Sequence, residues 1–192
     1  MCLSLWGQTQ PHPRSGRTLV RRCHIWYVGD PETGPEKTFT MSQTVIALAA
    51  DHAGFPLKEI MAEEVRALGY TVLDLGTHDT ASVDYPDFGH AAAEAVLDGR
   101  ATLAVICCGT GLGISMAANK YPGIRAALCH DATTARLSRE HNDANILALG
   151  ARVIGVEVAR DALRAFLDTP FGGDRHTRRV AKIGQVQTKE AV

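Results

Sequence analysis

Residues 103–120 read LAVICCGTGLGISMAANK, and the rest of the chain is best interpreted outward from this stretch. Apolar residues 103–106 predict a buried strand, the glycines at 109, 111 and 113 predict a tight turn, and residues 114–120 predict a helix. Such a strand–turn–helix leaves backbone N–H groups unpaired at the helix start, where they can bind an anion. Cys108 lies at this point, and the positive end of the helix dipole favours its thiolate. The stretch predicts either a reactive thiol beside an anion pocket or a packing turn with Cys108 as a small buried apolar residue.

Three familiar motifs do not fit this glycine-rich turn. The dinucleotide-binding fingerprint needs its third glycine where Ile114 stands. A Walker loop needs Gly-Lys-Ser/Thr at a spacing that neither Ser115 nor Lys120 provides. The arginine that a cysteine phosphatase carries soon after its nucleophile is also missing after Cys108. The turn therefore indicates neither nucleotide binding nor phosphatase chemistry.

The composition is typical of a soluble globular protein. The chain has 192 residues, a formal net charge of −1 and 45% hydrophobic residues, which fits one domain, with or without an appendage. The near-zero charge gives no signature of nucleic-acid or membrane binding, and no apolar run approaches the length of a membrane span. Five cysteines without a CxxC pair indicate neither a disulfide framework nor a zinc site. We therefore expect a cytoplasmic protein that binds neither nucleic acid nor membrane.

Residues 1–40 differ from the rest of the chain. They carry prolines at positions 11, 13, 31 and 35 and no sustained period of two or 3.6 residues. Residues 19–28 allow one brief strand for which no local partner is evident, and the segment lacks the apolar core of a secretory signal. We expect residues 1–40 to be an N-terminal extension, either a disordered tail or a wrongly assigned start, and residues 41–192 to form the folded domain.

From residue 41 onward, strand and helix patterns alternate. The predicted strands are residues 44–50, 70–75, 103–107, 124–129 and 145–149. The predicted helices are residues 55–69, 88–98, 114–120, a segment capped by Asp131, residues 156–167 and a basic segment from about residue 174. This order, with nearly continuous apolar strands, predicts a parallel sheet covered by helices on both faces. Because ligands bind such sheets at the carboxyl ends of the strands, the loops after residues 50, 107 and 129 are the expected ligand edge.

Polar residues gather at this edge, and each admits a structural alternative. Asp51 and His52 suit proton transfer or phosphate binding, although an aspartate there also suits a helix cap. Tyr85, in a predicted loop, can form a pocket wall or cover the edge of the core. The run HNDAN at residues 141–145 is more polar than solubility needs, but it also suits a turn.

Arginines add a second group at the C-terminal side of the chain. Arg175 and Arg179 are four residues apart, which places both on one face of a helix, where their guanidinium groups suit a phosphate. The alternative is that the two arginines belong to a solvated charged face of the helix. Arg152 follows the fifth strand and adds a cation near the ligand edge. Together, the thiol, the anion cradle, the His/Asp pair and the arginines suit proton abstraction beside a carbonyl on a phosphorylated small molecule.

Six segments carry a resemblance to the type B ribose-5-phosphate isomerases, a family that also includes galactose-6-phosphate isomerase subunits. The chain from residue 44 to about 183 resembles this family in DHAG (51–54), DYPDF (84–88), CGTGLGISMAANK (108–120), IRAAL (124–128), LSREHNDANILALGARVIG (137–155) and GDRHTRRV (173–180). The resemblance implies an α/β fold, a Rossmann-like three-layer αβα sandwich on a five-stranded parallel sheet. It also implies a homodimer or homotetramer with the site at the subunit interface, no metal and no cofactor. The implied reaction interconverts an aldose phosphate and a ketose phosphate through a cis-enediolate.

The resemblance also implies a role for each site residue. Cys108 is similar to the base that moves the proton between C1 and C2, and one branch of the family instead uses a glutamate at the position of Ile114. The amides of Gly109, Gly111 and Gly113 correspond to the cradle of the enediolate oxygen. The other implied roles are ring opening by Asp51, Thr110 and His141, contact with sugar oxygens by Asn142, phosphate binding by His52, Arg152, Arg175 and Arg179, and a pocket wall at Tyr85. Cys107 is expected to face away and to be dispensable.

Two other functions stay open at this point. The first is isomerisation of a tetrose or hexose phosphate, which pocket depth would decide. The second is a phosphosugar-binding protein in which Cys107 and Cys108 form a thiol switch. The presence of His141 and the arginines favours catalysis, because a switch does not need them.

Overall fold

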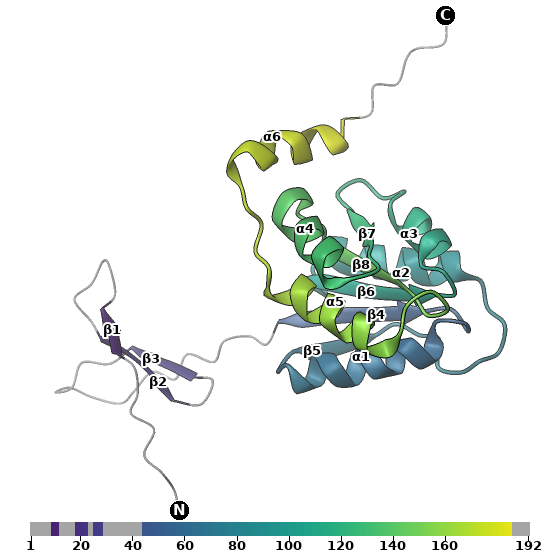
Figure 1. The fold of residues 1–192 in the computed structure, drawn as a ribbon, viewed down its shortest axis with the longest axis horizontal. Coiled ribbons are helices and arrows are strands. Elements are labelled where there is room, and N and C mark those ends of the chain that lie inside the picture. Colours follow the sequence, from purple (N-terminus) through teal and green to yellow (C-terminus); the bar gives the residue numbers. More distant parts are fainter. Residues whose placement is uncertain (1–8, 12–17, 23–24, 29–43, 186–192) are drawn as a thin grey trace, which may run out of the picture. The chain divides into compact units, whose positions relative to one another are not determined.

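The computed structural model describes residues 9–11, 18–22, 25–28 and 44–185 (Figure 1). The chain divides into two units, Met1–Gln43 and Thr44–Val192. All the residues that the sequence assigns to a site belong to the second unit.

The second unit is built on the five-stranded, all-parallel sheet that the sequence predicts. Its strands lie in the order β5 (Thr71–Asp74), β4 (Val45–Ala50), β6 (Leu103–Cys108), β8 (Ile146–Gly150) and β7 (Ala126–Leu128). The central strands β4, β6 and β8 are almost fully buried, which explains their continuous apolar sequences. The register pairs Ala50 with Cys107 and Cys108 with Gly150, so the loops that follow these three strands start side by side.

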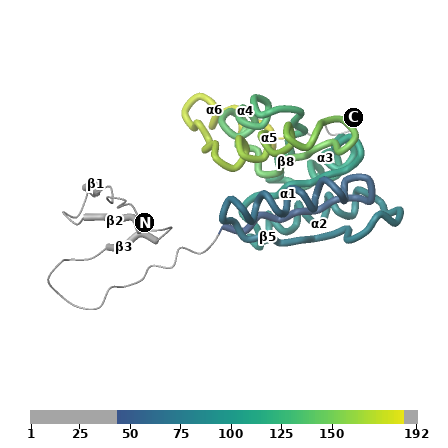
Figure 2. The backbone as a smooth tube through the Cα atoms, turned by 60° about the horizontal axis from the view of Figure 1, so that its bottom comes forward, coloured from purple at the N-terminus to yellow at the C-terminus, as the bar shows by residue number. Residues whose placement is uncertain are grey.

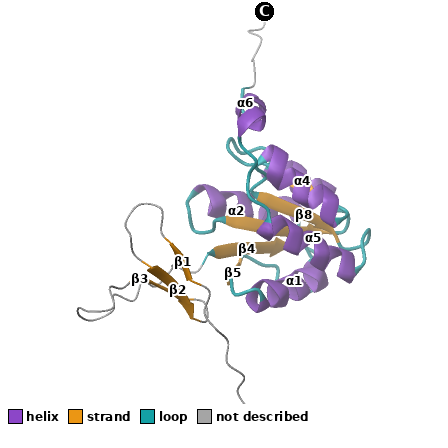
Figure 3. Cartoon of the chain, turned by 60° about the vertical axis from the view of Figure 1, so that its left-hand side comes forward, coloured by secondary structure: helices purple, strands orange, loops and turns teal. Residues whose placement is uncertain are grey.

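Helices cover both faces of the sheet, which confirms the three-layer αβα sandwich (Figure 3). On one face, α1 (Phe55–Ala67), α4 (Ala132–Asn142) and α5 (Val156–Asp168) bury apolar residues such as Met61 and Phe166. On the other face, α2 (Tyr85–Leu97) and α3 (Leu112–Ala118) contribute mainly alanines and Ile114. The last helix, α6 (Asp174–Ile183), lies beside α4 (Figures 1 and 2). None of the helices in the described ranges is long and apolar enough to cross a membrane.

Two predicted boundaries are wrong in ways that affect the site. Helix α2 begins at Tyr85 rather than at residue 88, because Asp84 is extended and Pro86 is tolerated in the first helical turn. Tyr85 is therefore the first residue of a helix and not part of a loop. Helix α3 begins at Leu112, two residues earlier than predicted, so that Gly113 belongs to its first turn.

The described residues of the first unit form three antiparallel strands, β1 (Thr9–Pro11), β2 (Thr18–Arg22) and β3 (Ile25–Val28). The expectation of a single brief strand without a partner in this region is wrong, since β2 pairs with β3 from Leu19 opposite Val28 to Arg22 opposite Ile25. Both runs are rich in β-branched or aromatic residues, as is typical of paired strands. The other residues of the predicted N-terminal extension lie outside the described ranges.

Candidate active site

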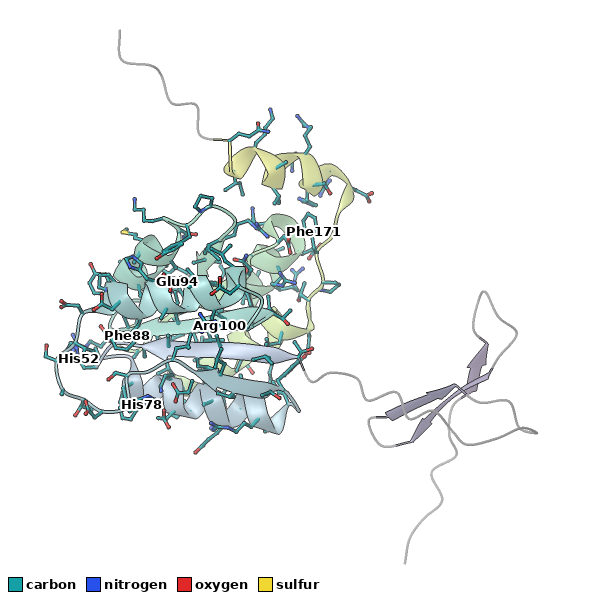
Figure 4. All side chains as sticks on the ribbon, turned by 180° about the vertical axis from the view of Figure 1, so that it is seen from behind. His52, His78, Phe88, Glu94, Arg100 and Phe171 are labelled. Atoms are coloured by element: carbon teal, nitrogen blue, oxygen red, sulfur yellow. The ribbon has the colours of Figure 1, made fainter. Side chains whose placement is uncertain are left out.

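A pocket of about 230 Å³ lies at the carboxyl ends of β4, β6 and β8. Every lining residue except Ala53 was predicted as a site residue. The lining consists of Asp51, His52, Ala53, Tyr85, Cys108, Gly109, Thr110, Gly113 and Arg152. Segments far apart in the sequence therefore meet where the parallel sheet predicts that they should. Figure 4 shows His52 at this end of the sheet.

Cys108 is the last residue of β6 and is only 4% exposed. The backbone N–H of Gly111 donates a hydrogen bond to its Sγ at 3.0 Å. Gly111 has a φ of 77°, and a Cβ there would lie 2.4 Å from a Leu128 methyl carbon, so only glycine fits this turn. An N–H donor aimed at sulfur stabilises negative charge on it, and this contact suits a thiolate.

The glycine amides divide into two groups. Gly111 directs its N–H at the thiol and does not line the pocket, whereas Gly109 and Gly113 do line it. The N–H of Ser115 donates to the Gly111 carbonyl at 3.3 Å, which starts the hydrogen bonding of α3. The amide of Gly113 precedes that bond and therefore has no acceptor within the helix, which leaves it available to a ligand.

Cys107 faces the opposite side of the sheet, as predicted. It is fully buried in the apolar cluster formed with α1, α4 and α5, while Cys108 belongs to the cluster on the α2 and α3 face. Burial raises the pKa of the Cys107 thiol far above its usual range, and the Cys108 and Asp51 side chains raise it further. Of the two adjacent thiols, only that of Cys108 reaches the pocket.

Asp51 and His52 combine a structural role with a place in the pocket. Oδ1 of Asp51 accepts a hydrogen bond from the Gly54 N–H at 2.8 Å and closes the turn that leads into α1. Nδ1 of His52 lies 3.2 Å from both the carbonyl oxygen and the backbone nitrogen of Val83. Asp51 therefore has a structural role in this turn and also lines the pocket, while its part in proton transfer or phosphate binding stays a prediction.

Tyr85 and Arg152 form the sides of the pocket. A Cβ at Gly113 would lie 2.7 Å from two ring carbons of Tyr85, so the ring lies directly against this glycine. The backbone N–H of Arg152 donates to the Gly109 carbonyl at 2.9 Å, and this bond fixes the start of the loop that carries the guanidinium. Tyr85 is 42% exposed, which fits a wall at the mouth of a pocket.

Besides Gly111, four predicted site residues lie outside this pocket, namely His141, Asn142, Arg175 and Arg179. His141 and Asn142 end α4, and both arginines lie on α6. Asn142 instead lines a larger, mainly apolar hollow of about 670 Å³ between α6 and the segment that leads into β7. That hollow contains no thiol, and the smaller pocket is therefore the better candidate for the chemistry. Within a single chain, none of these four residues lines the pocket that contains Cys108.

The polar run at residues 141–145 divides into a structural part and an exposed part. The Asp143 carboxylate lies between two arginines, 2.8 Å from a nitrogen of Arg125 and 3.1 Å from one of Arg139. Oδ1 of Asn145 accepts the Arg125 N–H at 2.8 Å. Asp143 and Asn145 therefore hold the turn that ends α4, where Asn142 is exposed and His141 is half-buried.

His176 lies on α6 beside Arg175, and no role was predicted for it from the sequence. It is nearly buried, and Arg175 Nε donates to its Nε2 at 3.3 Å. Burial lowers the pKa of His176, and the positive charges of His141, Arg175 and Arg179 lower it further. Its position among arginines on a helix gave no sign that the ring would pack against α4.

An α/β fold with a thiol, an imidazole and an arginine in one pocket at the strand ends defines an enzyme of small polar substrates. The chain belongs to the ribose/galactose isomerase family, whose model matches residues 46–183, and it is a sugar-phosphate isomerase. In the part of the chain that the structure describes, no group of three or more His, Cys, Asp or Glu side chains is arranged to hold a metal ion.

Three relatives illustrate the family. The solved structure of Clostridium thermocellum ribose-5-phosphate isomerase B is 54% identical, with a TM-score of 0.73 over 73% of this chain and 95% of that one. Ribose-5-phosphate isomerase B of Escherichia coli strain K12 is 42% identical over 144 residues, which are 75% of this chain and 97% of the relative. D-erythrulose-4-phosphate isomerase of Pectobacterium atrosepticum is 40% identical over 146 residues, which are 76% of this chain and 96% of the relative.

Proposed function

We propose that this enzyme interconverts ribose 5-phosphate and ribulose 5-phosphate through a cis-enediolate, with Cys108 as the base. The observation that carries the proposal is the position of Cys108, whose sulfur accepts the Gly111 N–H and lines the pocket together with Asp51, His52 and Arg152. The ribose-5-phosphate isomerases among its relatives support the choice of substrate.

In the proposed step, the Cys108 thiolate removes the proton from C2 of the open-chain aldose. The C–H bond breaks, an S–H bond forms, and the electron pair becomes the C1–C2 double bond while the carbonyl oxygen becomes anionic. The proton of the C2 hydroxyl passes to the anionic oxygen on C1, which becomes the C1 hydroxyl of the ketose. The thiol then returns its proton to C1, the electron pair of the C1–C2 double bond forms the new C–H bond, and the oxygen on C2 becomes the carbonyl of the ketose. The amides of Gly109 and Gly113, two glycines that line the pocket, are proposed to stabilise the anionic oxygen, a contribution of about 3 kcal/mol per donor.

The phosphate and the sugar ring need further groups. His52 and Arg152 supply an imidazole and a guanidinium within the pocket, and Arg175 and Arg179 are proposed as additional phosphate ligands. Asp51, Thr110 and His141 are proposed to open the furanose ring, and Asn142 to contact sugar oxygens. Tyr85 is proposed as the wall that limits the substrate.

The enzyme is proposed to act as a homodimer or homotetramer with its site at the subunit interface. This assembly would explain why His141, Asn142, Arg175 and Arg179 lie away from Cys108 within one chain, because a second copy can supply them. A cytoplasmic location is also proposed, since a reducing compartment suits Cys107, Cys108 and Cys129, which are all free thiols in the described part of the chain.

Isomerisation of a tetrose phosphate is the second candidate, favoured by the relative that acts on D-erythrulose 4-phosphate. Isomerisation of a hexose phosphate is the other candidate that the sequence leaves open. A thiol switch between Cys107 and Cys108 is not supported, because the two side chains lie on opposite faces of the sheet and a disulfide would require backbone movement.

A panel assay of the purified full chain with tetrose, pentose and hexose phosphates tests the proposal. The highest kcat/KM is expected for ribose 5-phosphate. A higher value for a tetrose or hexose phosphate would move the assignment to that substrate, and the absence of turnover with every sugar phosphate would overturn the proposed function.

A further inference from the structure

Lys58 is a buried lysine that the proposed chemistry does not use. It lies on α1 with 0% of its side chain exposed, whereas lysine is almost never fully buried in proteins unless it is paired. Its Nζ lies 2.6 Å from Oδ1 and 2.8 Å from Oδ2 of Asp74, at the end of β5. Glu59 Oε1 lies at 3.1 Å, and the Phe55 ring centroid at 5.5 Å. The ammonium is therefore held mainly by one bidentate carboxylate.

The same carboxylate holds the loop that follows β5. Oδ1 of Asp74 accepts the backbone N–H of Gly76 at 3.0 Å. The Gly76 carbonyl then accepts the N–H of Ala50 at 2.7 Å, and the Thr77 N–H donates to the Ala50 carbonyl at 2.8 Å. Ala50 immediately precedes Asp51 and His52, so the Lys58–Asp74 pair is connected to the pocket through three successive backbone contacts.

The far end of this loop touches the pocket directly. Val83 contacts Nδ1 of His52 through its backbone at 3.2 Å, and Tyr85 starts α2 two residues later. The contact with Val83 fixes the plane of the His52 ring and leaves Nε2 as the nitrogen that can meet a ligand. In Figure 4, His52 and His78, which lies in this loop, are seen at the same end of the sheet.

We propose that Lys58 and Asp74 form a positioning pair for the phosphate-binding side of the pocket, with His52 as the group that they orient. The pair fixes one end of the loop at residues 75–84 against β4, and Val83 at the other end then holds the imidazole in the orientation that binds phosphate. This inference rests on the proposed role of His52 as a phosphate ligand.

Stability alone is a weak explanation for the pair. A buried ion pair often contributes little net stability compared with apolar residues of similar size, because two charges lose their hydration. The Lys58 side chain is fully buried, whereas that of Asp74 is 29% exposed. Substituting Asp74 alone would therefore leave a buried, unpaired ammonium and confuse misfolding with misplacement. The double variant Lys58→Met/Asp74→Ala removes both charges and the acceptor for Gly76 without leaving an unpaired ion.

The test measures binding of inorganic phosphate to the full chain by NMR titration of the His52 imidazole signals, together with KM and kcat for the sugar phosphate. In Lys58→Met/Asp74→Ala, and in Lys58→Met/Asp74→Asn as a milder variant that keeps an oxygen acceptor for the Gly76 N–H, the phosphate Kd and KM are expected to rise threefold or more while kcat stays within twofold. Glu64→Gln is the matched control, since Glu64 lies on the same helix and pairs with Arg164 at 2.6 Å on the side of α5. It is expected to leave both constants unchanged.

Two results would overturn the inference. The first is a phosphate Kd equal to that of the wild type, together with His52 imidazole signals at their wild-type chemical shifts, in both variants that substitute Asp74. The second is a fall in kcat alone at constant KM, because a merely destabilised protein loses active molecules without losing affinity. The phosphate titration needs no turnover, so a wild-type chain that binds phosphate but isomerises no sugar phosphate would contradict the proposed function and not this inference.

Discussion

The imidazole rings of His141 and His176 are stacked, with their centroids 4.4 Å apart and their planes at 7°. This contact joins the end of α4 to α6, which also carries Arg175 and Arg179. One of the three predicted ring-opening residues, His141, is therefore joined to the helix of two predicted phosphate ligands, and none of these residues lines the Cys108 pocket of its own chain. These residues are suited to complete the pocket of a second copy, as proposed.

The role of His141 in ring opening can be separated from proton transfer at carbon. Ribulose 5-phosphate has no furanose ring, because its C5 oxygen carries the phosphate. His141→Asn is therefore expected to lower the conversion of ribose 5-phosphate by about 100-fold or more. The same variant should still exchange the C1 hydrogen of ribulose 5-phosphate with D₂O, measured by NMR, within about tenfold of the wild-type rate. Equal loss of both activities would contradict a role limited to ring opening.

Arg179→Ala is expected to raise KM for the sugar phosphate about tenfold and to change kcat little. A guanidinium that binds phosphate in the ground state and the transition state alike contributes uniform binding. Arg178→Ala is the matched control, because this neighbour on the same helix is exposed and has no assigned role. Steady-state kinetics that show an unchanged KM for Arg179→Ala would remove this residue from the phosphate site.

The acid stability of the domain is expected to depend on Asp74. Burial raises the pKa of Asp74, but hydrogen bonds from Lys58 and Gly76 and the Lys58 charge outweigh burial and hold it below its ordinary value. Since the folded pKa lies below the unfolded one, the contribution is present above about pH 4 and is lost as the pH falls through the folded pKa. Urea unfolding of Asp74→Asn should therefore show a smaller loss of stability below about pH 4 than the wild type. Asp98→Asn, which alters an exposed pair with Arg100, should follow the wild type.

Residues 1–43 are proposed to be dispensable for the fold and activity of the second unit. They form a separate unit, and the family match begins only at residue 46. Deletion of these residues is expected to leave the thermal unfolding midpoint and kcat/KM unchanged, as measured by calorimetry and the isomerase assay. A large loss of stability or activity would show that the first unit is an integral part of the enzyme.

Much of the fold was predictable because its signals are local. The apolar runs of β4, β6 and β8 predict central parallel strands, and the carboxyl-end rule places Asp51, Cys108 and Arg152 at one edge. The opposite orientations of Cys107 and Cys108 follow from the two-residue period of a strand.

The rest depends on contacts between segments distant in sequence, which no local pattern encodes. The Lys58–Asp74 pair joins α1 to β5, and the His141–His176 stack joins α4 to α6. The start of α2 at Tyr85 was missed because a helix can begin one residue before a proline. Within residues 141–145, only the positions of Arg125 and Arg139 reveal that Asp143 is structural.

The central claim is that the Cys108 thiol moves the proton between C1 and C2. Cys108→Ala is expected to lower kcat by about 1000-fold or more while the sugar phosphate still binds, since this substitution removes only the base. Cys107→Ala is the matched control, because the Cys107 thiol is buried on the other face of the sheet. The kcat of this variant should stay within about twofold of the wild-type value.

The most direct measurement is the incorporation of deuterium from D₂O at C1 of ribulose 5-phosphate, compared between the wild type, Cys108→Ala and Cys107→Ala. Exchange catalysed by the wild type and by Cys107→Ala, but not by a Cys108→Ala protein that still binds the sugar phosphate, is the predicted result. Exchange by Cys108→Ala at the wild-type rate would contradict the account.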